Sequence, residues 1–299
     1  MAKYLDPKAD LTFKKIFGEH PELVISLLNA LLPLKDDERV ESIEYWPAEK
    51  IPRRTEAEKN SIVDVCCHDN KKREFIVEMQ MTWTESFKKR VLLNASKAYV
   101  AQSEVGEPYQ LLQPVYALNF VNAPMNIGTD GYYHHYQLVH QEKSDEVIDG
   151  LQLVFIELPK FQPHTFSERK MQVLWLRFLT EINENTTEAP AEMLENPELS
   201  EALKIVEMAA YTPEEMREYD KFWDAISTHK TEILDYELKI EQAKAEAEEA
   251  KAKAEEAKAK AEEAKAKFMD SARKMKAKGI GTQDIAEITG LTAAEIEAL

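Results

Sequence analysis

The chain has 299 residues, of which 44% are hydrophobic and 9% aromatic, which is enough for one substantial core with an appendage. Its first residues, up to Lys15, are charged and lack an apolar stretch, so we expect no signal peptide. No apolar run approaches the roughly 20 residues that span a bilayer, so we expect no membrane segment. The net charge of −17 disfavours phosphate binding unless lysines and arginines are gathered locally.

The cysteine content points to a reducing compartment. Cys66 and Cys67 are the only cysteines, and they are adjacent. Adjacent cysteines lack the spacing of a zinc site and are poorly placed for a structural disulfide. We therefore expect a cytoplasmic protein in which both are core residues rather than nucleophiles.

The first half of the chain predicts a mixed α/β domain over residues 1–160. An amphipathic helix is expected over 11–32 and ends at Pro33. β-Branched and aromatic residues predict the strands that follow, and a second helix separates them. The expected strands are 40–50, 60–68, 73–82, 114–121, 132–140 and 151–157, with the helix at 85–105. The order is αβββαβ with added strands.

The second half is predicted to be helical. Residues 161–240 form a helical region, with helices expected from about 165 and at 198–210 and 214–230. Residues 241–267 form a charged helix in which AKAEEAK repeats with a period of seven. Its seam consists of alanines, which bury little area, so a solvated spacer is slightly favoured over a homo-oligomeric coiled coil.

The last segment, 268–299, resembles a helix-turn-helix. Gly290 is expected to end one short helix, and Thr292 and Glu295 form a capping box that begins another. The second helix is acidic and carries no basic or amide side chain that could contact bases. A packing or protein-contact role is therefore favoured for this tail over DNA binding.

The apolar pattern of strands 60–68 and 73–82 predicts how they pair. Their apolar faces coincide in a hairpin only when the loop has an odd number of residues, either 70–72 or 69–73. Both registers place Asp64 opposite Glu78, with Cβ atoms roughly 4.5–5.5 Å apart. Gln80 lies two residues further along, on the same face.

Two facing carboxylates repel each other unless a cation lies between them. Hard oxygen ligands suit Mg²⁺ or Mn²⁺, so Asp64 and Glu78 are candidate metal ligands with Gln80 beside them. The arrangement suits metal-assisted phosphodiester hydrolysis. The competing interpretation is the solvated face of an antiparallel sheet. The apolar neighbours Ile62, Cys66 and Ile76, and the helix that follows, count against it.

These residues carry a family resemblance. Asp64, Glu78 and Gln80 follow D-x(13)-E-x-Q, which resembles the D…(D/E)xK signature with Gln in place of Lys. The segment DLTFKKIFG at 10–18 and the pattern R-x(8)-Y-x(6)-G-x(2)-Y from Arg90 are similar to the recombination-promoting nuclease family, also called PD-(D/E)XK family transposases. The resemblance covers roughly residues 5–240.

The resemblance implies a restriction-endonuclease-like core and Mg²⁺-dependent cleavage of DNA, in recombination, transposition or phage defence. Asp64, Glu78 and the carbonyl of Met79 would bind the metal, and Gln80 would orient the attacking water. Because Gln cannot accept a proton, proton removal would fall to metal-bound hydroxide or to a phosphate oxygen.

The resemblance also implies supporting residues. Asp10 would either add a ligand or cap the first helix. Arg90 and Tyr99 would face phosphate, brace the site or pack. The positions of the basic residues, independently of the resemblance, indicate either a local basic surface or a solvated helix face, formed by Lys14, Lys15, Lys88, Lys89 and Arg90.

Two alternatives to the nuclease remain open. One is a degenerate nuclease fold that binds a partner protein through its charged helix and tail, which the net charge and Gln80 favour. The other is a DNA-binding regulator that acts through residues 268–299. The pair His134 and His135 points to opposite faces of a strand and cannot chelate one ion.

Overall fold

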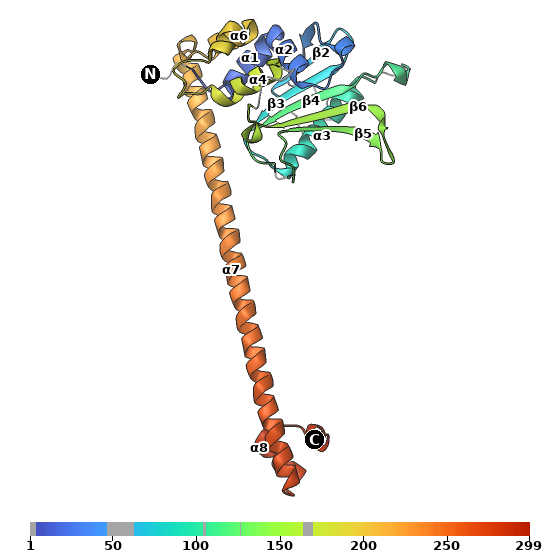
Figure 1. The fold of residues 1–299 in the computed structure, drawn as a ribbon, viewed down its shortest axis with the longest axis vertical. Coiled ribbons are helices and arrows are strands. Elements are labelled where there is room, and N and C mark those ends of the chain that lie inside the picture. Colours follow the sequence, from blue (N-terminus) through green and yellow to red (C-terminus); the bar gives the residue numbers. More distant parts are fainter. Residues whose placement is uncertain (1–3, 47–62, 104–105, 126, 164–169) are drawn as a thin grey trace. The chain divides into compact units, whose positions relative to one another are not determined.

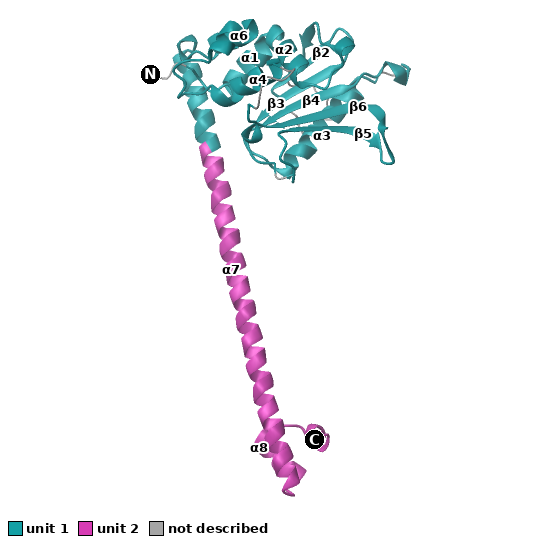
Figure 2. Ribbon diagram, viewed as in Figure 1, with its two compact units in different colours: residues 1–226 teal, residues 227–299 magenta. Residues whose placement is uncertain are grey.

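The computed structural model describes residues 4–46, 63–103, 106–125, 127–163 and 170–299. It divides into two units, residues 1–226 and 227–299 (Figure 2). In the described residues, no helix combines the length and apolarity required to cross a membrane.

The first unit is built on a six-stranded mixed sheet with the order β1-β2-β3-β4-β6-β5 (Figure 1). The strands are β1 (Ile43–Tyr45), β2 (Val65–Asp69), β3 (Glu74–Gln80), β4 (Val115–Val121), β5 (Tyr133–His140) and β6 (Lys143–Glu157). Antiparallel pairing joins β1, β2 and β3, whereas β4 lies parallel to both β3 and β6. β5 is the antiparallel edge strand. The expected αβββαβ order is confirmed.

Helices cover both faces of this sheet. On one face, α1 (Asp10–Glu19), α2 (Pro21–Leu31), α4 (Lys170–Glu181) and α6 (Pro197–Ile205) share a core with the inward side chains of the strands. On the other face, α3 (Glu85–Ala101) packs through Phe87, Val91, Ala95 and Ala98. α3 connects β3 to the parallel strand β4, as a crossover helix does. It therefore runs over the strand that carries Glu78 and Gln80.

The expected single helix over 11–32 is wrong, because the chain breaks at His20. Pro21 has no N–H and begins a new helix at its first position. The expected strand 60–68 is displaced as well: residues 60–62 lie outside the described residues, and β2 begins only at Val65. The strand expected over 40–50 is β1, with residues 47–50 also outside the described part.

The helices after residue 170 belong to the same core as the sheet. Trp175 and Phe178 are fully buried among side chains of α1, α2 and the strands. The expected boundary at residue 160 therefore falls within a continuous core, and the chain separates after Ile226 instead. The described residues of this unit also form α5 (Ala191–Glu195) and four short 3-10 helices, at Asp36–Glu38, Tyr109–Leu111, Leu158–Lys160 and Met208–Ala210.

The helices expected at 214–230 and 241–267 form one helix, α7 (Pro213–Ala277), which crosses the division between the units. The second unit also contains α8 (Thr282–Thr289) and α9 (Ala293–Glu297). Gly290 ends α8 with a left-handed φ of 69°. The Thr292–Glu295 capping box is confirmed. The second unit has a small core of its own, formed by Ala272, Ile285, Leu291 and Ile296.

Candidate active site

The β2–β3 hairpin has the register that the apolar pattern predicts. Val65 pairs with Val77, and Cys66 pairs with Ile76, so the five residues 69–73 form the loop. Asp64 directly precedes β2, and the same register aligns it with Glu78. Cys66 and Ile76 face the α3 side, and Glu78 shares that face because side chains alternate along a strand.

The Asp64 side chain, rather than a backbone carbonyl, accepts the hydrogen bond of the Met79 N–H at the end of the hairpin. Its Oδ2 atom accepts a hydrogen bond from the Met79 N–H at 2.8 Å. Burial raises the pKa of Asp64, and the bond from Met79 opposes that rise. The negative charge of Asp10 raises the pKa further, whereas Lys14 and Arg90 lower it.

Glu78 is held by two side chains of α3. The side chain amide of Asn94 donates to its Oε1 atom at 3.1 Å, and Arg90 Nη2 lies 3.4 Å from Oε2. Burial raises the pKa of Glu78; Arg90 and the bond from Asn94 lower it, and the charge of Asp64 raises it. The two carboxylates therefore interact unfavourably when both are ionised.

Arg90 links Glu78 to Gln80. The same Nη2 atom donates to Gln80 Oε1 at 2.9 Å, and Gln80 Nε2 donates to the Thr82 hydroxyl at 3.4 Å. Both ends of the Gln80 amide thus have partners that fix its orientation. Within the described residues, Arg90 is the cationic side chain that pairs with Glu78.

The backbone of Met79 points to the same edge of β3 as Asp64. Within an extended strand, the N–H and C=O of one residue face the same neighbouring strand. Because the Met79 N–H bonds to Asp64, its carbonyl oxygen also faces the β2 side. This backbone oxygen is therefore available next to the Asp64 carboxylate.

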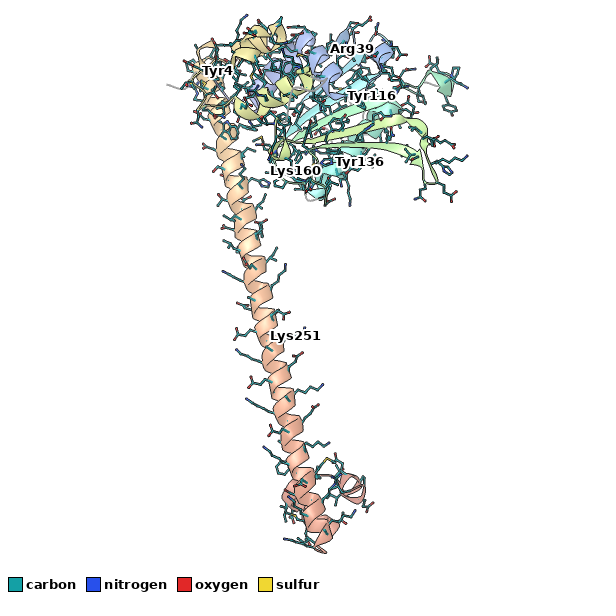
Figure 3. The ribbon with its side chains drawn as sticks, in the orientation of Figure 1. Tyr4, Arg39, Tyr116, Tyr136, Lys160 and Lys251 are labelled. Carbon is teal, nitrogen blue, oxygen red and sulfur yellow. The ribbon has the colours of Figure 1, made fainter. Side chains whose placement is uncertain are left out.

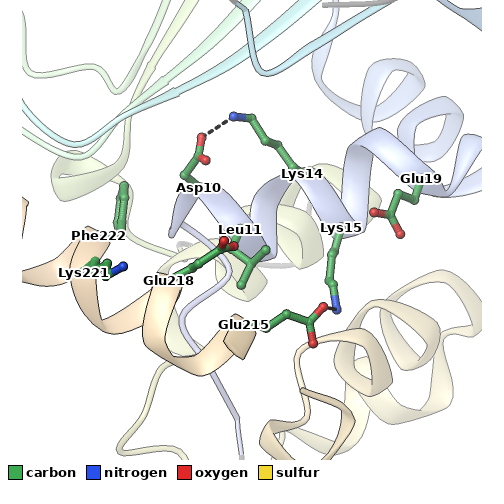
Figure 4. Close-up of a pocket in the computed structure, with 9 residues that line it drawn as sticks. All are labelled: Asp10, Leu11, Lys14, Lys15, Glu19, Glu215, Glu218, Lys221 and Phe222. Carbon is green, nitrogen blue, oxygen red and sulfur yellow. Dashed lines mark ion pairs between the residues drawn. The ribbon is translucent and has the colours of Figure 1, made fainter. Parts of the chain in front are cut away.

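Asp10 and Lys14 approach the site from α1. Asp10 is the first helical residue, and the cap position belongs to Ala9, with no side-chain cap bond. Asp10 instead pairs with Lys14 at 2.7 Å, on the wall of an open groove of about 800 Å³ between α1 and the start of α7 (Figure 4). In the same groove Lys15 pairs with Glu215 at 2.5 Å.

Tyr99 lies far from the acidic pair. Its ring packs near Gly150, within 3.6 Å of where a Cβ atom would stand. Gly150 precedes Leu151, which is level with Val115 and Glu74 at the start of the parallel strands. Glu78 lies near the other end of β3. The structure brings Asp64, Glu78, Gln80, Arg90 and Asp10 into one region, and it places Tyr99 outside that region.

Two buried amides next to Glu78 were not predicted from the sequence. Asn94 is 1% exposed and interrupts the apolar face of α3. A polar residue on that face could have been recognised in the sequence. Asn119 is fully buried on β4 and is the register partner of Glu78. Its Oδ1 atom has no hydrogen-bond partner among the described residues. Nothing in the sequence alone indicates that pairing.

The donor set fits a hard divalent cation. Asp64 and Glu78 supply two carboxylates, and the Met79 carbonyl and the Gln80 amide add neutral oxygens. Mg²⁺ is commonly bound by one or two carboxylates and keeps several waters. Among the described residues, no group of three His, Cys, Asp or Glu side chains is close enough to hold a metal.

The other titratable candidates are structural. Cys66 and Cys67 are buried free thiols, and burial raises the pKa of Cys66 to about 12, so it is not a reactive thiolate at neutral pH. His134 lies 3.5 Å from the buried Glu157. His135 bonds to Gln152 at 2.6 Å on the opposite face of the sheet.

A mixed sheet flanked by helices, with two acids at the end of a central hairpin, defines the class of restriction-endonuclease-like nucleases. The family model for the PD-(D/E)XK nuclease family transposases matches residues 7–233. The chain belongs to this family. No curated protein and no solved structure is detectably similar to it.

Proposed function

We propose that the chain is a divalent-metal-dependent DNA endonuclease whose active centre consists of Asp64, Glu78 and Gln80. The observation that carries the proposal is the β2–β3 register, which, extended by one residue, aligns the half-buried Asp64 with the buried Glu78. Membership of a nuclease family supports it, because such nucleases generally use divalent metals and act on DNA.

Each residue has a role that follows from its contacts. Asp64 and Glu78 would hold Mg²⁺ or Mn²⁺, with the Met79 carbonyl on the same side. A bound ion supplies Lewis-acid stabilisation of the phosphate and a more acidic water. Gln80, oriented by Arg90 and Thr82, would position the attacking water. Because Gln80 cannot accept a proton, a phosphate oxygen of the substrate would take it.

Arg90 would neutralise Glu78 until a divalent ion binds there. It is half-exposed and neutralises Glu78 only at 3.4 Å, so it can turn away when an ion arrives. In that position its guanidinium would suit a phosphate of the bound strand. Asn94, which donates to the buried oxygen of Glu78, would keep the carboxylate in place during the exchange.

Plasmid nicking in the presence of Mg²⁺ tests the proposal. We expect Asp64→Ala to abolish nicking while the far-ultraviolet circular dichroism stays unchanged. The matched control is Asp145→Ala, which removes an exposed acid of β6 and should leave nicking intact. Equal nicking by the Asp64 variant and the wild type would refute the assignment.

The second candidate is a degenerate nuclease fold that acts by binding a partner protein. Gln80 in place of Lys and the absence of a third acidic ligand among the described residues favour it. Calorimetric titration with Mn²⁺ separates the two proposals. A functional centre binds the ion and loses it with Asp64→Ala, whereas a degenerate centre gives no heat in either protein.

A further inference from the structure

A band of cations and aromatic rings begins at Arg90 and crosses the α3 face of the sheet. Its members are Trp83, Phe87, Lys88, Arg90 and Tyr136, and we call it the cation–aromatic band. The Arg90 guanidinium lies 4.9 Å from the Phe87 ring centroid. The Lys88 ammonium lies 5.6 Å from the Trp83 ring and 5.8 Å from the Tyr136 ring. Two separate elements, α3 and the edge strand β5, thus meet at Lys88.

One buried ring forms the floor of the band. Phe155 is fully buried and meets Trp83, Phe87 and Tyr136 edge-on, at centroid distances of 6.2, 6.2 and 5.7 Å. The interplanar angles of 86°, 85° and 88° are those of the edge-to-face arrangement that aromatic pairs favour. Tyr136 is 39% exposed, and its place on the sheet is marked in Figure 3.

The band is continuous with the candidate active site. Arg90 bonds to Glu78 and Gln80 on one side and contacts Phe87 on the other. Phe155 is the register partner of Asn119, which is the partner of Glu78. Two strand spacings separate Glu78 from Phe155, which is roughly 10 Å. A strand of nucleic acid cut at Glu78 can therefore reach the band.

Lys88 is the cation of the band that no carboxylate neutralises within the described part of the chain. Neither Lys88 nor Lys89 forms an ion pair within the described part of the chain, whereas Lys14 and Lys15 are both paired with carboxylates. These two lysines and Arg90 are consecutive in a chain of net charge −17. They are the local gathering of positive charge that a phosphate backbone requires.

We propose that the cation–aromatic band binds an unpaired segment of the DNA strand that is cut. Lys88 contacts its phosphates, and a base stacks on Tyr136. The proposal rests on the proposed nuclease function and specifies its substrate class. A ring can stack on a base only if that base is unpaired, because the bases of a duplex already stack on each other. Stacking also supplements the small number of cations.

Fluorescence anisotropy of a labelled oligothymidine, measured in EDTA, tests the band without cleavage. We expect Tyr136→Leu to weaken binding about tenfold, and Tyr136→Phe, which keeps the ring, to bind like the wild type. Lys88→Gln should weaken binding and reduce the slope of log affinity against log salt by about 0.7. Lys35→Gln removes an exposed lysine of another region and should change neither quantity.

The same measurement with a labelled duplex of equal length shows whether the band binds unpaired or duplex DNA. We expect Tyr136→Leu to leave duplex binding unchanged, and an equal loss for both probes would overturn the assignment to an unpaired strand. The assignment of the band as a binding site would be overturned if the wild type did not bind oligothymidine. It would also be overturned if neither Tyr136→Leu nor Lys88→Gln weakened that binding. Asp145→Asn, at an exposed position of β6, should bind oligothymidine normally. A protein that binds but never cleaves with metal would contradict the nuclease proposal and leave the band standing.

Discussion

The two site carboxylates oppose folding in the metal-free protein. Burial raises the pKa of both Asp64 and Glu78, so each contributes stability below its ordinary pKa and loses that contribution as the pH rises through the raised value. Above the raised values, both groups are ionised and repel each other. A divalent ion held by both carboxylates would remove this penalty, so we expect ion binding to stabilise the protein.

Neutral variants should therefore stabilise the protein when metal is absent. We expect Glu78→Gln and Asp64→Asn to raise the melting temperature in EDTA at pH 8, because each removes a buried charge and keeps an acceptor oxygen. Each should also abolish the stabilisation that Mn²⁺ gives the wild type. Below the ordinary carboxylate range the melting temperatures should converge. A lower melting temperature at pH 8 would contradict this account of the site.

Glu74, at the other end of β3, makes a separate contribution to the pH dependence. Burial raises its pKa from 4.5 to about 7. Its stabilising contribution is complete below pH 4.5 and is lost as the pH rises through about 7. We expect Glu74→Gln to flatten the dependence of the melting temperature on pH across that window. Glu41→Gln, at an exposed position, should leave the slope unchanged.

At the scale of elements, the β2–β3 hairpin determines where the acids lie. Its turn is held by Asp69, whose carboxylate accepts from the Arg73 backbone and pairs with the Arg73 guanidinium at 2.6 Å. Both side chains are almost fully buried. The turn thus fixes the register that aligns Asp64 with Glu78.

Removal of Arg73 should cost about 3–5 kcal/mol, because it leaves the Asp69 charge buried without a partner. We expect Arg73→Ala to lower the free energy of unfolding by that amount in urea titrations. The double variant with Asp69→Ala should recover part of the loss. A loss below about 1 kcal/mol for the single variant would place it in the range of a surface ion pair and contradict a buried one.

The sequence predicted this hairpin because the information is local. Alternating apolar residues in two neighbouring strands permit only a register with an odd loop, and the five-residue alternative is confirmed. The contacts of Glu78 with Asn94 and Asn119 could not be predicted in the same way. They depend on how α3 docks and on the register of β4, and no periodicity within a strand specifies either.

Other departures from expectation have local causes. The break between α1 and α2 was signalled by Pro21, whose position suits the start of a helix. The repeat at 241–267 differs in composition from its neighbours, yet the backbone bonds of α7 continue across both junctions. A change of composition along a helix therefore does not by itself mark an element boundary.

At the scale of the whole molecule, the division after Ile226 shows which residues fold together with the candidate active site. Tyr219 is buried against Leu5, with Phe222 and Trp223 packed on the same cluster. Residues 227–299 have a core of their own. The beginning of α7 therefore belongs to the first unit.

We expect a chain ending at residue 226 to melt cooperatively and to bind Mn²⁺ like the full chain. A chain ending at residue 212 should melt at a clearly lower temperature, since it loses the cover of Leu5. Differential scanning calorimetry of both truncations distinguishes these outcomes. Equal melting of the two would show that the first turns of α7 contribute nothing to the first unit.

The central claim is that Asp64 and Glu78 share one divalent ion. Isothermal titration of Mn²⁺ into the full chain at pH 8, without DNA, tests it most directly. The account predicts one binding event per chain that Asp64→Asn and Glu78→Gln each abolish and that Asp145→Asn leaves unchanged. Binding that survives in either site variant would contradict the claim, as would a wild-type protein that binds no ion.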